Sequence, residues 1–191
     1  MSFWASRLDR AAVDPRAGQF VPAPVPFVHD VRGWTEDLVV AGEIHSNERL
    51  SDVFNRREMI SIHRPTVRRL GVLGWPVPCE ERLEVDPFDF DIVLGGAQNP
   101  AEADRRAAQR IHKVRYPVIV TGRTFEVRGT MHLFPGLAPE YAAHRTNVLF
   151  IPLTRATARH GGSNVSDGRA DVVLVNRYAI KEIRQSVFEA V

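Results

Sequence analysis

Short runs of alternating apolar and polar residues follow one another along most of the chain, and this pattern is typical of β-strands that bury one face. The clearest runs are residues 59–68 and 150–159, and more apolar strands follow them at residues 91–94 and 171–176. One segment differs, because Asn99 suits a helix cap, Pro100 fits a first helical turn and Glu102 completes a capping box. We therefore expect a mainly β chain (β-rich α+β) with one helix over residues 99–115.

An internal repeat organises these strands. Residues 40–45 and 127–132 share the pattern Val-x-Gly-x-x-His, and residues 59–68 align without gaps on 150–159 with identical Ile, Arg, Thr and Arg. Residues 91–94 (DIVL) match residues 171–174 (DVVL). Three matches in the same order indicate a duplication. The expected organisation is an arm over 1–30, a first copy over 31–98, a linker helix over 99–115 and a second copy over 116–191.

The second copy ends in an apolar strand at 171–176, a three-residue turn and a short strand at 180–184. This ending resembles that of Sm-like and SH3-like small β-barrels, and the first half resembles a diverged copy. The resemblance implies two tandem small β-barrel-like units, and we expect residues 116–121 to close the first. Residues 49–55 (RLSDVFN) are also similar to a stretch of uncharacterised bacterial domains, although Ser51, Asp52 and Asn55 suit capping and turn formation.

The N-terminal arm is rich in proline, which favours extended backbone. It also carries Phe3, Trp4 and Leu8, which make it too apolar for a solvated tail. We expect these three side chains to pack on the arm's own domain or on a neighbouring subunit.

Composition narrows the protein class. The chain is 44% hydrophobic and 25% charged, which is ordinary for a globular protein. No run approaches the ~20 apolar residues of a membrane span, and no secretory signal is visible, so we expect a cytoplasmic protein. The single cysteine, Cys79, excludes an internal disulfide and is expected to be a small buried residue. No cofactor or metal motif is present, and we expect neither.

Charge is divided into two patches although the formal net charge is only +2. Residues 56–69 are rich in arginine, and residues 80–91 are rich in Asp and Glu. The two segments are expected either to lie side by side as antiparallel strands or to meet across subunits. The balance lacks the strong positive charge of a typical nucleic-acid-binding protein, so nucleic acid is the less favoured partner.

Two arginine rows are the candidate binding residues. Strand geometry places Arg64 and Arg68 on one face of the first strand, and Arg155 and Arg159 on one face of the second. Such rows suit phosphates or an acidic partner, and the alternative is the solvent-exposed face of a half-buried strand. His45 and His132 are expected to be structural, and His160, beside Gly161 and Gly162, is expected in a loop.

The repeat, the arm and the segregated charges together favour a non-enzymatic assembly or scaffold protein that binds protein partners or self-associates. The alternative is a regulator that binds an anionic ligand or nucleic acid through the paired arginine rows.

Overall fold

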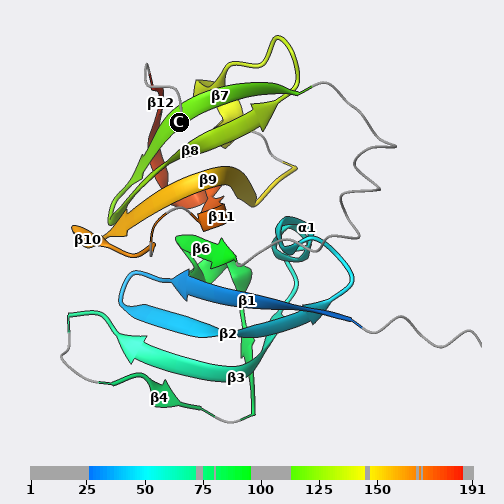
Figure 1. Ribbon diagram of the computed structural model, residues 1–191, viewed down its shortest axis with the longest axis vertical. Coiled ribbons are helices and arrows are strands. Elements are labelled where there is room, and N and C mark those ends of the chain that lie inside the picture. Colours follow the sequence, from blue (N-terminus) through cyan, green and yellow to red (C-terminus); the bar gives the residue numbers. More distant parts are fainter. Residues whose placement is uncertain are drawn as a thin grey trace, which may run out of the picture.

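The computed structural model describes residues 26–71, 75–79, 81–95, 113–144, 147–166, 168 and 170–186. The described residues form one antiparallel sheet of twelve strands, which confirms the mainly β prediction (Figure 1). The first half of the described chain, residues 26–95, holds β1 (Phe27–Trp34), β2 (Leu38–Ser46), α1 (Leu50–Asn55), β3 (Ile60–Arg69), β4 (Val77–Pro78), β5 (Arg82–Val85), the 3-10 turn η1 (Pro87–Asp89) and β6 (Ile92–Gly95). The second half, residues 113–186, holds β7 (Val114–Gly122), β8 (Phe125–Leu133), η2 (Pro139–His144), β9 (Phe150–His160), β10 (Ser163–Asn164), β11 (Ala170–Asn176), η3 (Arg177–Ala179) and β12 (Ile180–Gln185).

The strands run in the order β12-β7-β8-β9-β11-β6-β1-β2-β3-β4, with β10 beside β9 and β5 beside β3. The expected barrel-like units are therefore not closed barrels, because β6 pairs with β11 and makes the sheet continuous and open. In Figure 1 the first half lies below and the second above, and β6 and β11 meet between them. In each half the last strand lies beside the first, β6 against β1 and β12 against β7.

Two predictions about the strands need correction. Residues 91–94 and 171–174, aligned as equivalent copies, are direct neighbours, with Val93 opposite Leu174. Residues 116–121 belong to β7 and pair with β8 and β12, so they do not complete the first half. The strand that lies against β1 is β6 itself.

Two predicted boundaries also move. β1 begins at Phe27, inside the predicted arm, and β7 begins at Val114, inside the predicted helix 99–115. Residues 99–112 of that predicted helix, and the arm residues Phe3, Trp4 and Leu8, lie outside the described residues.

A β-bulge interrupts the pairing at the same place in each half. Gly42 of β2 faces two residues of β3, and Gly129 of β8 faces two residues of β9. The first of each facing pair, Arg64 and Arg155, has a left-handed φ of 49° and 51°. An inserted residue reverses the alternation of buried and exposed positions. In β3 the buried positions accordingly change from Ile62 to Pro65.

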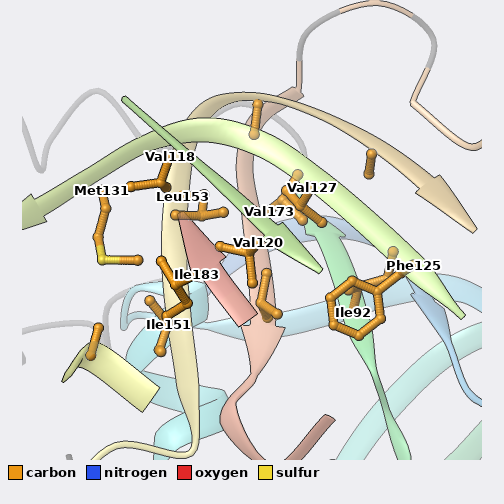
Figure 2. Close-up of a cluster of buried hydrophobic side chains, with 14 of the residues drawn as sticks. Ile92, Val118, Val120, Phe125, Val127, Met131, Ile151, Leu153, Val173 and Ile183 are labelled. Carbon is orange, nitrogen blue, oxygen red and sulfur yellow. The ribbon is translucent and has the colours of Figure 1, made fainter. Parts of the chain in front are cut away.

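Two hydrophobic clusters lie on the two faces of the joint between β6 and β11, and each half contributes to both. Ile92 of β6 packs among Val120, Phe125 and Val173 of the second half (Figure 2). Conversely, Leu174 of β11 packs in the cluster of first-half side chains. Burial of each such side chain stabilises the fold by roughly 1.5–3 kcal/mol. The halves are thus bound to each other by the same side chains that fill their cores.

Two asparagine side chains reinforce this joint. Asn55, at the end of α1, accepts hydrogen bonds from the backbone N–H of Leu149 (2.7 Å) and Phe150 (2.8 Å) and donates to the Phe150 carbonyl (3.2 Å). Asn176 of β11 donates to the carbonyl of Phe90 at 2.8 Å. Asn55 therefore does more than form a turn, because it fixes α1 to the start of β9 in the other half.

Candidate functional site

A cleft of about 740 Å³ opens between the two halves. One wall is the outer surface of β1, β2 and β3 with the segment after β3, and its residues are Arg32, Trp34, Glu36, Val39, Ala41, Thr66, Arg68, Leu70, Gly71 and Pro76. The other wall combines the β7–β8 turn with the end of β9 and the following hairpin, and its residues are Thr124, His160, Gly161, Ser163, Asn164 and Val165. In Figure 1, β10 and the β1–β2 turn lie on the same side of the molecule, where these walls meet.

Strand register places the charged groups on the first wall. Arg32 of β1 lies opposite Ala41 of β2, which lies opposite Thr66 of β3. Arg68 belongs to the neighbouring row, which contains Trp34 and Val39. Both arginine side chains are exposed, and among the described lining residues they are joined by one carboxylate, Glu36. The wall therefore combines two exposed arginines with apolar residues such as Val39 and Leu70.

His160 lies at the base of the second wall, which corrects its assignment to a loop. It is the last residue of β9 and is only 4% exposed. Both ring nitrogens are buried without a hydrogen-bond partner among the described residues, as is Nε1 of Trp34 on the opposite wall. Burial lowers the pKa of His160, although the charge of nearby Asp91 acts in the opposite direction. The ring is therefore neutral at pH 7.

Asp91 connects the two halves beside this histidine. Its carboxylate accepts a hydrogen bond from Oγ1 of Thr124 at 3.0 Å and lies 4.0 Å from Nε2 of His160. Its backbone N–H donates to the carbonyl of Trp34 at 2.8 Å, and its carbonyl accepts from the N–H of Asn176 at 2.9 Å. The base of the cleft is thus fixed by bonds from both halves.

The predicted arginine rows do not converge on one site. Arg64 forms an ion pair with Glu43 of β2, and this pair holds the pKa of Glu43 below its usual value. Arg159 donates to the carbonyl of Gly162 at 2.8 Å, and Arg155 is exposed on β9. Of the four, Arg68 is the one that lines the cleft.

The other residues singled out from the sequence lie apart from the cleft. His45 stacks on His63 with ring centroids 4.3 Å apart, and His132 lies 2.8 Å from Oγ1 of Thr154. Cys79 is exposed, so its predicted burial is wrong, because it follows the short edge strand β4. Within the described ranges, no three His, Cys, Asp or Glu side chains gather closely enough to hold a metal ion.

One of the two predictions for the basic and acidic segments is confirmed. The segments lie side by side as antiparallel strands, because β3 pairs with β5. However, Arg64 of β3 and Glu84 of β5 form their ion pairs with other residues than each other. Glu84 of β5 bonds Ser61 and Arg82, and Arg64 of β3 turns to β2 instead.

Sequence reasoning missed Arg32, Trp34, Asp91 and His160. The joint brings them together, and their separation along the chain hides that proximity. The described residues contain no helix long and apolar enough to cross a membrane. Comparison with known proteins finds no matching family model, no matching curated protein and no matching solved structure.

Proposed function

We propose that this chain is a non-enzymatic binding protein that holds a small anionic ligand in the cleft between its halves. The observation that carries the proposal is the pair of exposed guanidinium groups, Arg32 and Arg68, on one wall of a cleft of about 740 Å³. Small-molecule sites occupy roughly 300–1,000 Å³ and combine apolar walls with a few convergent polar groups.

Charge favours an anion over a cation. Among the described residues that line the cleft, Arg32 and Arg68 outnumber the one carboxylate, Glu36, and His160 adds no charge at pH 7. Guanidinium groups bind carboxylates and phosphates through two parallel hydrogen bonds. The hydroxyl of Ser163 and the amide of Asn164 on the opposite wall add uncharged hydrogen-bonding groups.

The lining also suits a ligand with an apolar part. Val39, Leu70 and Val165 line the same space. An anionic head held by the arginines and an apolar body against these side chains would use both kinds of surface.

The geometry at the base of the cleft supports binding over catalysis. A general base must come within about 2.6–3.2 Å of the group it deprotonates. His160 and Asp91 lie 4.0 Å apart, and both ring nitrogens of His160 are covered. His160 therefore presents no exposed ring nitrogen to a ligand in this arrangement.

The test is a thermal-shift titration with three probes: inorganic phosphate, citrate and adenosine monophosphate. Binding to the folded state raises the melting temperature. We expect at least one probe to bind, and Arg32→Ala with Arg68→Ala to weaken that binding about tenfold or more. The matched control removes two exposed arginines elsewhere, Arg115→Ala and Arg155→Ala, and should leave the shift unchanged. Equal loss in both variants, or no shift with any probe, would contradict the proposal.

The assembly function predicted from the sequence stays a prediction. Most of the arm that motivated it lies outside the described residues, and the edge strands β5 and β12 carry charged side chains.

A further inference from the structure

The joint between the halves is a pairing of two strand edges. β6 and β11 face each other over four register pairs, from Ile92 opposite Val175 to Gly95 opposite Val172. Because side chains alternate along a strand, each of these strands sends every second residue into the core of its own half and the others toward the opposite half. The side chains that cross the joint are Ile92 and Leu94 from β6, and Val172 and Leu174 from β11.

The outer strands β5 and β12 occupy the corresponding positions at the two ends of the sheet. β5 pairs with β3 as β11 pairs with β9, since Val85 faces Ile60 and Val175 faces Ile151 at the starts of those strands. A 3-10 turn then follows each, capped by Asp86 (2.9 Å to the N–H of Phe88) or by Asn176 (3.0 Å to the N–H of Tyr178). After the turn, β6 lies against β1 and β12 lies against β7.

Each residue of the joint strands β6 and β11 therefore has a counterpart in the outer strands β12 and β5. The residues that face their own core are apolar on both edges, namely Val93 and Ile183, Val173 and Leu83, and Val175 and Val85. The residues that cross the joint are apolar as well, whereas their counterparts in the outer strands are charged. The outer counterparts of Ile92, Leu94, Val172 and Leu174 are Glu182, Arg184, Arg82 and Glu84, and all four are exposed.

The four outer charges are also paired along their own strands. Arg82 lies 2.6 Å from Glu84, and Arg184 lies 3.4 Å from Glu182. Within the described part of the chain, β5 and β12 each have a hydrogen-bonded neighbour on one side. Charged side chains are a known means of preventing an edge strand from pairing with another chain, because pairing would bury them.

We infer that the outer strands β12 and β5 form the same docking interface as the joint, and that these four charges prevent it from binding. Without the charges, its partner would be a second copy of this chain. In that contact β12 of one copy lies antiparallel to β5 of the next, in the register of β6 and β11. The charges thereby keep the chain as one unit of two halves.

The experiment transfers the joint's residues to the outer edges. One variant carries Glu182→Ile and Arg184→Leu, and the other carries Arg82→Val and Glu84→Leu. Light scattering after size-exclusion chromatography should show each variant, and the unmodified chain, at the mass of one chain. An equimolar mixture of the two variants should give a complex of two chains, and the chain with all four changes should form larger assemblies.

The matched control makes the same exchange on a strand that has neighbours on both sides, Glu126→Ile and Arg128→Leu of β8, and should stay at the mass of one chain. Association of either edge variant with itself, equal association of the control, or a mixture that stays at one chain mass would overturn the inference. If a double variant fails to fold, the mixture of Arg184→Leu with Glu84→Leu applies the same test. An unmodified chain that already associates through β5 and β12, so that Glu182→Lys with Glu84→Lys separates the copies, would also refute it.

Discussion

Arg64 and Arg155 hold the same left-handed backbone conformation, with φ of 49° and 51°, in strands from opposite halves of the chain. Each arginine lies in a β-bulge opposite a glycine, and the bulge leaves no space for a side chain at that glycine. A Cβ on Gly42 would lie 2.7 Å from the carbonyl oxygen of His63, and a Cβ on Gly129 would lie 2.7 Å from the Cβ of Ala156. The two halves therefore share a strand plan down to the backbone angle of single residues.

The bulge arginines should be replaceable by glycine with a gain in stability. A left-handed conformation costs a non-glycine residue about 1–2 kcal/mol, which exceeds the entropic cost of glycine. We expect Arg155→Gly to raise the free energy of unfolding by about 0.5–1 kcal/mol in urea denaturation. Arg64→Gly should gain less, because it also loses the ion pair with Glu43. Arg115→Gly, at an exposed β7 position without positive φ, should lower the free energy, and a similar loss at Arg155 would refute the argument.

Asn55 should contribute to the free energy of unfolding of the whole molecule, although it lies on a helix of only six residues. Replacement by alanine leaves the N–H groups of Leu149 and Phe150 without their acceptor, and each unsatisfied buried group costs about 1–3 kcal/mol. We expect Asn55→Ala to lower the free energy of unfolding by about 2–4 kcal/mol while unfolding stays a single transition. Asn47→Ala, at an exposed position, should change it little. Separate unfolding of the two halves would contradict the shared cores.

His160 should make stability fall in mild acid. Its folded-state pKa lies below the usual 6.5 because of burial. Between the folded and unfolded pKa values only the unfolded chain binds the proton, so the free energy of unfolding decreases as the pH falls below about 6.5. We expect His160→Gln to reduce this slope in urea denaturation between about pH 7 and 5.5. His144→Gln, at an exposed position, should leave the slope unchanged, and an equal effect of both changes would exclude His160 as its source.

Much of the strand content follows from the alternation of apolar and polar residues, because one buried face imposes it. The joint could not be predicted in that way. Residues 91–94 and 171–174 look alike because both strands are covered on two faces, and that likeness suggested equivalent copies where the structure has neighbours. The burial of His160 depends on the same joint, so its place beside two glycines indicated a loop. The arginine rows were predicted from an unbroken alternation, whereas a bulge at Arg64 and at Arg155 interrupts it, and their convergence depends on distances that a strand pattern does not contain.

The most direct test of the proposed function observes the indole N–H of Trp34 by NMR while phosphate, citrate or adenosine monophosphate is added. The chain has three tryptophans, and Trp34→Phe identifies the signal. We expect the Trp34 signal to shift in a saturable way with at least one probe, and we expect Arg32→Ala with Arg68→Ala to abolish the shift. A Trp34 signal that stays in place with all three, or that shifts equally in the arginine variant, would contradict an anion site in this cleft.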